Sequence, residues 1–101
     1  MNPSLSRDYA YYKVNETRLS DHDVIQSVHK EIFAKVDNDL PQSLVLDLNN
    51  VEFLVSLFLG KLMLLYKHIS GKGGELVLTN VNEQITHVLE MTNLTKLIKI
   101  N

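Results

Sequence analysis

Cysteine is absent from this chain of 101 residues. Disulfide bonds, thiolate zinc sites and a cysteine nucleophile are therefore excluded. No run of basic residues occurs, and the formal net charge of -2 gives no electrostatic reason to expect nucleic-acid binding. The longest apolar stretch, residues 51–66, is interrupted by polar residues and is too short for a membrane-spanning helix. Residues 1–14 lack the pattern of a signal peptide, so we expect one cytoplasmic domain without direct membrane insertion.

The rest of the chain alternates short apolar segments with longer stretches of helical periodicity. The expected strands cover residues 9–14, 44–48, 75–79 and 97–100. The first expected helix begins between residues 20 and 23 and ends near residue 38, and the other two cover residues 57–70 and 83–91. This order predicts an α/β fold in which helices pack against a mainly parallel sheet of four to five strands.

The middle helix is expected to present one apolar face to the core. That face consists of Phe58, Leu62, Leu65, Tyr66 and Ile69. We expect Ser56 to be the N-cap of this helix, and the glycines of residues 71–74 to end it. In the last helix, Val88 and Leu89 are expected to be core residues.

Groups that could carry catalysis are few and scattered. None of the four histidines has the spacing of a metal-binding motif, so neither a metal site nor a cofactor is predicted. Asp47 and Glu52 could serve acid–base chemistry if a cleft joined them, but capping of a loop by Asp47 and solvent exposure of Glu52 are favoured. The Gly-rich residues 71–74 close a helix and open a strand, which is the reverse of a phosphate loop. No catalytic residue is predicted, so a non-enzymatic protein is expected.

Leu57, Lys61, Leu64 and His68 form one stripe on the middle helix, because they follow one another at helical spacing. The stripe lies away from the expected core face. An apolar pair framed by basic groups is typical of a surface that binds a protein partner, although incidental exposure or burial in a homodimer remain alternatives.

Three segments together resemble the STAS family, the sulphate transporter and anti-sigma factor antagonist domains. They read LVLDLNNVEFLVSLFLGKL, GGELVLTNV and VLEMTNLTKLIKI, in the order and spacing of the family's switch segment, glycine-led strand and closing segment. The resemblance covers about residues 11–100 and implies a single STAS-like domain over residues 1–101. The family usually opens with a hairpin, so we expect a first edge strand that is short or missing.

The resemblance also places the family's switch on this chain. In the antagonist branch an Asp-Ser-Ser-Gly-like motif is phosphorylated at its second hydroxyl residue by a kinase-like anti-sigma factor. Its four positions correspond here to Val55, Ser56, Leu57 and Phe58. The phosphoacceptor position is thus a leucine, which cannot take a phosphate, and Ser56 is the one remaining hydroxyl in the switch.

The resemblance therefore implies a protein-interaction module of a bacterial partner-switching system, whose partner is an anti-sigma factor or kinase-like regulator. The expected partner-binding residues are Val55, Ser56, Leu57, Phe58, Lys61 and Leu64, with Ser56 as a candidate phosphorylation site. The alternatives are a STAS-type accessory subunit of a membrane transporter complex and a homodimer that buries Leu57 and Leu64. Nucleotide binding has been suggested for some family members, but nothing else in this chain supports it.

Overall fold

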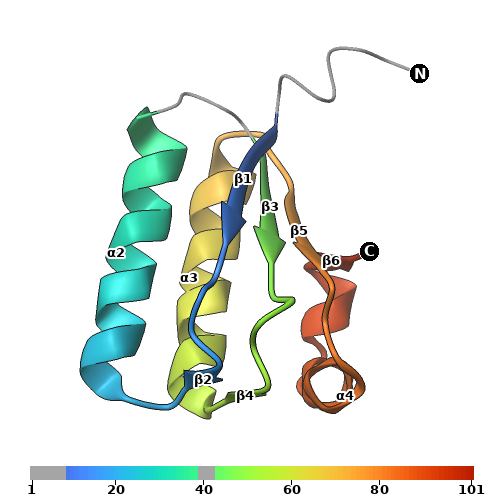
Figure 1. Ribbon diagram of the computed structural model, residues 1–101. Helices are drawn as coiled ribbons and strands as arrows, with labels where there is room; N and C mark the ends of the chain where they lie inside the picture. Colours follow the sequence, from blue (N-terminus) through green and yellow to red (C-terminus); the bar gives the residue numbers. More distant parts are fainter. Residues whose placement is uncertain (1–8, 39–42) are drawn as a thin grey trace.

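The computed structural model describes residues 9–38 and 43–101. Four strands form one parallel sheet in the spatial order β1-β3-β5-β6. They are β1 (Tyr9–Lys13), β3 (Ser43–Asp47), β5 (Leu76–Thr79) and β6 (Lys99–Ile100). Figure 1 shows β1, β3 and β5 side by side, with the arrows of β1 and β3 pointing toward the bottom of the view. The first edge strand, which we expect to be short or missing, would fall on residues 1–8, and these lie outside the described part.

Helices α2 (His22–Asn38) and α3 (Ser56–Gly71) lie next to each other on one face of this sheet (Figure 1). Helix α4 (Glu83–Met91) and the short 3-10 helix η1 (Leu94–Lys96) follow β5 and lead to β6. The prediction of an α/β fold with helices on a parallel sheet of four to five strands is confirmed.

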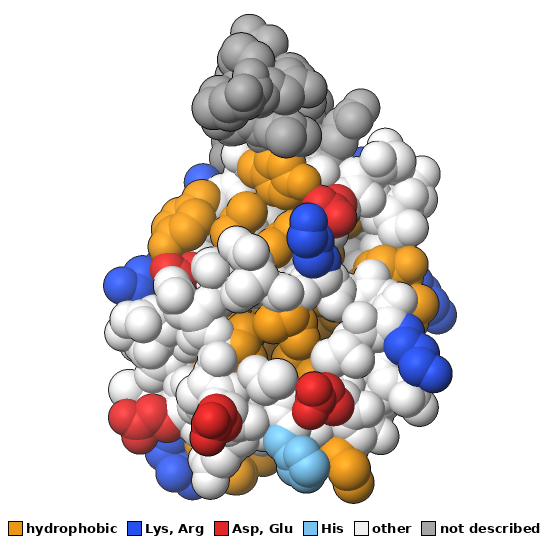
Figure 2. Space-filling model, turned by 90° about the vertical axis from the view of Figure 1, so that its right-hand side faces the viewer, with side chains coloured by type: hydrophobic (Ala, Val, Ile, Leu, Met, Phe, Trp, Pro, Cys, Tyr) orange, Lys and Arg blue, Asp and Glu red, His pale blue; other side chains and the backbone are white. Residues whose placement is uncertain are grey.

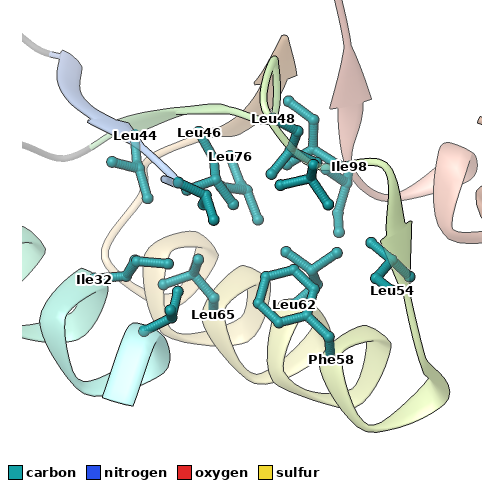
Figure 3. Packing of buried hydrophobic residues seen from close by; sticks show 14 of the residues in the cluster. Ile32, Leu44, Leu46, Leu48, Leu54, Phe58, Leu62, Leu65, Leu76 and Ile98 are labelled. Atoms are coloured by element: carbon teal, nitrogen blue, oxygen red, sulfur yellow. The ribbon is translucent and has the colours of Figure 1, made fainter. Parts of the chain in front are cut away.

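The core lies between the sheet and the helix pair. Leucines at alternate positions of β3 and β5 point toward α3, whose Phe58, Leu62 and Leu65 point back at them (Figure 3). The leucines alternate because successive side chains of a strand point to opposite faces of the sheet. The three residues of α3 share one side of the helix because a helix has 3.6 residues per turn. The expected core face of α3 is confirmed for Phe58, Leu62, Leu65 and Ile69, while Tyr66 is partly buried at its margin.

The opposite face of the sheet is not covered by α2 or α3. The row Tyr11, Val45 and Val77 crosses this face in register. Val77 is buried but does not belong to the main core cluster. Figure 2 looks onto this side and shows apolar side chains near its centre, with charged groups around them.

A second sheet was not expected from the sequence. It consists of two parallel two-residue strands, β2 (Arg18–Leu19) and β4 (Phe53–Leu54). Strands this short carry no periodic signal that a sequence pattern could reveal. They matter because β4 leads directly into α3.

Three local predictions need correction. Val88 is 36% exposed rather than buried, and Ile85 takes its place beside Leu89 in the core. The last strand covers Lys99–Ile100 only, because residues 97–98 form the turn after η1, where the amides of Leu97 and Ile98 both donate to the carbonyl of Leu94. Of the glycines expected to end α3 in left-handed conformation, Gly73 has a positive φ of 83°, while Gly71 is still helical.

Candidate functional site

The expected switch segment is held in place by the small sheet at the start of α3. The amide of Val55 donates to the carbonyl of Leu19 (3.1 Å), and the amide of Glu52 donates to the carbonyl of Thr17 (2.7 Å). The guanidinium of Arg18 lies 4.6 Å from the ring centre of Phe53, in a cation–π contact. Residues 52–55 are thus tied to residues 17–19, so the orientation of the first turn of α3 is fixed by a segment distant in sequence.

Val55, not Ser56, is the N-cap of α3. Its backbone is extended, with φ −109° and ψ 169°, and its carbonyl accepts the amide of Phe58 at 2.9 Å. No side chain caps this helix, and its first turn has no acidic residue. The expectation that Ser56 caps α3 is therefore wrong by one position. Ser56 is instead the first helical residue, and its side chain is exposed.

The two leucines of the stripe are exposed, as expected. Leu57 is 39% exposed and Leu64 is 50% exposed, although both are large apolar side chains. Val55 is partly buried and packs against the core, which leaves part of its side chain accessible beside Leu57. Phe58 is 1% exposed, so its expected role as a partner-binding residue is wrong. It is a core residue, because one step along a helix rotates a side chain by 100° away from its neighbour.

The basic half of the stripe turns toward α2. Lys61 is partly buried, and His68 lies over the ring of Phe33 with ring centres 4.7 Å apart. Phe33 also contacts His29 on its own helix, at 4.5 Å between ring centres. The stripe is therefore exposed at Leu57 and Leu64 but joined to α2 at His68.

His29 has a buried Nε2 atom without a hydrogen-bond partner among the described residues. Burial lowers the pKa of His29 below its usual 6.5, and the nearby charge of Lys61 lowers that pKa further. At neutral pH the His29 ring is therefore uncharged.

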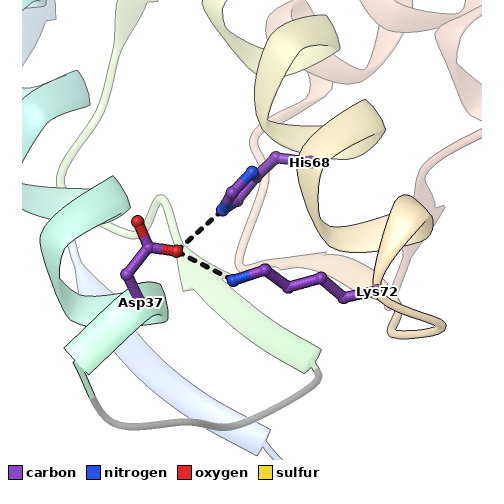
Figure 4. A network of polar contacts seen from close by, with 3 residues as sticks. All are labelled: Asp37, His68 and Lys72. Atoms are coloured by element: carbon purple, nitrogen blue, oxygen red, sulfur yellow. Dashed lines mark hydrogen bonds and ion pairs between the residues drawn. The ribbon is translucent and has the colours of Figure 1, made fainter.

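An ion network fastens the other end of the same pair of helices. Asp37 of α2 contacts Nε2 of His68 at 2.8 Å and accepts a hydrogen bond from Nζ of Lys72 at 2.9 Å (Figure 4). The hydrogen bonds from Lys72 and then His68 lower the pKa of the Asp37 carboxyl. These three side chains are partly exposed, so the network positions the C-terminal end of α3 more than it stabilises the fold.

A groove lies beside the switch, between β4 and α4. Its volume is about 320 Å³, and its walls are mainly apolar; they are formed by Glu52, Phe53, Leu54, Gln84, Ile85, His87 and Val88. Phe53 and Val88 are both exposed along it. Sequence reasoning missed this groove, because it arises only when α4 folds back beside the two-residue strand β4.

Asp47 ends β3 as a buried carboxylate. It accepts hydrogen bonds from the amide of Asn49 (2.9 Å), from Nδ2 of Asn80 (3.1 Å) and from the hydroxyl of Tyr11. Burial would raise the pKa of Asp47, but these hydrogen bonds outweigh burial and hold that pKa below 3.8. The hydrogen bond to Asp47 in turn raises the pKa of Tyr11. The expectation that Asp47 caps a loop and that Glu52 faces water is confirmed.

Among residues 9–38 and 43–101, no three histidine, aspartate or glutamate side chains come together as a metal site. No helix there is long and apolar enough to cross a membrane.

The sequence and the structure of this chain are both similar to those of known proteins. Residues 17–101 match the STAS domain family. The chain is 31% identical over 80 residues to an anti-sigma F factor antagonist from Paenibacillus polymyxa, which covers 79% of this chain and 68% of that protein. It is 34% identical over 61 residues to a STAS-domain containing protein from Pseudomonas aeruginosa, which covers 60% of each. The crystal structure of TM1081 from Thermotoga maritima superposes with a TM-score of 0.78 at 28% identity, over 92% of this chain and 78% of that one. The chain belongs to the STAS domain family.

Proposed function

We propose that this chain acts by binding another protein, in the manner of an anti-sigma factor antagonist, and not by catalysing a reaction. The observation that carries the proposal is the exposure of Leu57 and Leu64 on one side of α3, directly after the switch. The names of relatives from the family agree with such a role. The partner is an anti-sigma factor or a kinase-like regulator, and the binding face consists of Val55, Ser56, Leu57, Lys61 and Leu64.

The face has the properties of a small protein-binding surface. Complete burial of a leucine side chain is worth about 1.5–3 kcal/mol, and both leucines have accessible surface left to bury. Apolar anchors with a charged group at the rim are common in interfaces, where the charge orients the partner and raises the association rate. Lys61 is that charged group here.

The antagonist mechanism differs in this chain at the switch itself. Leu57 stands at the position of the phosphoacceptor and cannot be phosphorylated, so no phosphate at that position can break the apolar contact. Ser56 is exposed one residue earlier, at the first position of α3. A phosphate there would carry a charge of about −1.5 to −2 and would be favoured by the positive end of the helix dipole. Removing water from this charge beside Leu57 would cost free energy, so the phosphate would weaken the apolar contact with a partner. Ser56 is thus the one place in the switch where a phosphate could turn binding off.

The test is affinity purification from the native cell with the wild-type chain and two variants as baits. Leu57→Asp places a charge in the middle of the face, whereas Leu97→Asp places the same charge on another exposed leucine, just after η1. We expect one protein partner to be recovered with the wild type and with Leu97→Asp, but lost by at least tenfold with Leu57→Asp. Circular dichroism of each bait checks that the fold is retained.

Equal recovery of the partner with Leu57→Asp would overturn the proposal. Recovery of the ATPase and permease of a transporter would assign the chain to the accessory-subunit role instead. A homodimer is recognised by sedimentation, because Leu57→Asp would then convert a dimer into a monomer without any other protein being lost. Mass spectrometry of the recovered wild-type chain shows whether Ser56 carries a phosphate.

A further inference from the structure

Gly60 lies in the interior of α3, where the fold itself does not need a glycine. The residue is exposed, and a Cβ atom added to it would meet no other heavy atom within 4 Å beyond its own stretch of helix backbone. Its φ is not in the left-handed region. Glycine in a helix interior is unfavourable relative to alanine, because it loses more backbone entropy on folding. The missing side chain therefore serves nothing inside the described part of this chain.

The glycine sits between the two exposed leucines. Leu57 precedes it by three residues and Leu64 follows it by four, so both are its neighbours on the helix surface. Together with Lys61 these residues occupy positions i, i+3, i+4 and i+7. Four residues at this spacing form the hole that receives a side-chain knob when two helices pack together. With glycine as one of the four, the hole is deeper than usual. We call these four residues the Gly60 notch.

The charged side chains of α3 have one sign. Helix α3 contains no aspartate or glutamate, whereas it carries Lys61 and Lys67. Across residues 9–38 and 43–101, neither of these lysines forms an ion pair. An apolar hole with an unpaired ammonium at its corner is complementary to an apolar side chain that has a carboxylate close by.

We propose that the Gly60 notch receives an apolar side chain from an acidic amphipathic helix of the protein partner. This inference rests on the proposed function and specifies the chemistry of the partner. The apolar knob contacts Leu57 and Leu64, and a carboxylate one turn away on the same partner helix pairs with Lys61. Two exposed turns of α3, about 10 Å long, are enough for one such contact.

The first test separates the effect of a substitution on binding from its effect on stability. Gly60→Ala and Gly60→Leu fill the notch, and Gly71→Ala is the matched control. Gly71 also belongs to α3 and also has open space around its Cβ position, but it lies about three turns away from Gly60 and about two turns beyond Leu64. Gly60→Ala is expected to raise the melting temperature by roughly 4–8 °C, because alanine is the better residue in a helix interior, and Gly71→Ala, at the last residue of α3, is expected to raise it less.

Binding is then measured by titration calorimetry with the partner purified through the wild-type bait. Gly60→Ala is expected to weaken binding about tenfold and Gly60→Leu by at least a hundredfold, because a side chain then occupies the place of the knob. Gly71→Ala is expected to bind as the wild type does. A stabilised variant that binds more weakly cannot be explained by damage to the fold.

Charge is tested with Lys61→Glu against Lys96→Glu, which reverses an exposed lysine on η1. We expect Lys61→Glu to reduce the association rate at least tenfold at low salt, and Lys96→Glu to change it less than twofold. Wild-type binding by Gly60→Leu, together with loss of binding by Leu57→Asp, would overturn the notch while leaving the proposed function intact. Unchanged binding by Leu57→Asp would overturn both.

Photocrosslinking identifies the occupant directly. A photoreactive diazirine analogue of methionine at position 63 lies three residues from Gly60, and the variant Met63→Leu is the control. The expected crosslink joins this position to a helical segment of the partner with an aspartate or glutamate within one turn of the linked residue. A crosslink to lipid, to a second copy of this chain, or to a partner segment without acidic residues would overturn the proposal.

Discussion

Leu57 and Phe58 are adjacent in the chain but point in directions about 100° apart around α3, one toward solvent and one toward the core. Leu57 is 39% exposed and Phe58 is 1% exposed. The peptide bond between them therefore marks the border between the surface that can meet a partner and the core that holds the helix to the sheet. One residue of the switch can be changed for its effect on binding, and the next can be changed only at the expense of the fold.

This division predicts opposite outcomes for two neighbouring alanine substitutions. Phe58→Ala should lower the free energy of unfolding by about 3–5 kcal/mol, because it removes a large buried side chain and leaves a cavity. Leu57→Ala should lower that free energy by no more than about 1 kcal/mol, because its side chain is only partly buried. Urea denaturation followed by circular dichroism measures both. Similar losses for the two variants would contradict the assignment of Leu57 to the surface.

Asp47 predicts a loss of stability that depends on pH. Its folded-state pKa is held below 3.8, so it stabilises the fold above the pKa of the unfolded chain, and this contribution is lost as pH falls through the folded-state pKa. Asp47→Asn should therefore cost about 1–3 kcal/mol at pH 7, which is typical of hydrogen bonds to a buried charge. At pH 3 the cost should be smaller.

Glu52→Gln is the control for Asp47→Asn, because Glu52 is an exposed carboxylate on the segment that follows β3. It should change the free energy of unfolding by less than about 0.5 kcal/mol at either pH. Guanidinium denaturation at pH 7 and pH 3 gives the comparison. A cost for Asp47→Asn that stays the same at both pH values would show that the carboxylate charge does not carry the effect.

The sequence predicts most of this fold because its signals are local. The strands of the main sheet are short apolar segments between turn residues, and α3 shows its buried face through the spacing of Leu62, Leu65 and Ile69. The same periodicity places Leu57 and Leu64 at the surface. Matching the family's switch position by position assigns Phe58 to the partner face. The helical rotation of 100° per residue assigns it to the core face, and the structure shows Phe58 in the core.

The features that the sequence could not predict depend on contacts between distant segments. Strands β2 and β4 are two residues long and are recognisable only by their pairing. The groove beside the switch needs α4 to lie next to β4, and the contact of Phe33 with His68 joins residues on two helices. Val88 faces this groove instead of the core for the same reason.

Asn82 predicts a coupling between α4 and the switch segment. Its Oδ1 atom accepts the amide of Ile85 at 2.8 Å and so caps α4, while its Nδ2 atom donates to the carbonyl of Val51 at 3.2 Å. Asn82→Ala should cost about 1–2 kcal/mol, the usual loss when an N-cap is removed. Asn82→Asp should cost less, because it keeps the capping oxygen and loses only the Nδ2 donor to the carbonyls of Val51 and Glu52.

Thermal denaturation of the two Asn82 variants gives this order, and Asn15→Ala, at an exposed asparagine outside any helix or strand, is the control. Equal losses for Asn82→Ala and Asn82→Asp would show that the hydrogen bond to Val51, and not the cap, is the important contact. Amide exchange should also rise at residues 51–54 in both variants, since the two segments are no longer tied together.

His29 predicts that acid weakens the contact between α2 and α3. The folded-state pKa of His29 lies below 6.5, because its ring is partly buried and Lys61 of α3 is nearby. The unfolded chain therefore takes up a proton at this residue before the folded chain does. The free energy of unfolding should then decrease as pH falls through 6.5, and should stop decreasing once pH is below the folded-state pKa.

His29→Gln removes this titration while keeping a polar side chain of moderate size. We expect the variant to lose less stability than the wild type between pH 8 and pH 5.5, as measured by urea denaturation at each pH. His87→Gln is the control, because His87 is exposed on α4. Nuclear magnetic resonance of the His29 ring gives its pKa directly, and a value above 6.5 would contradict the burial of an uncharged ring.

Since Lys61 also borders the Gly60 notch, a carboxylate that pairs with Lys61 would reduce the electrostatic repulsion between Lys61 and protonated His29. Partner binding should therefore raise the pKa of His29.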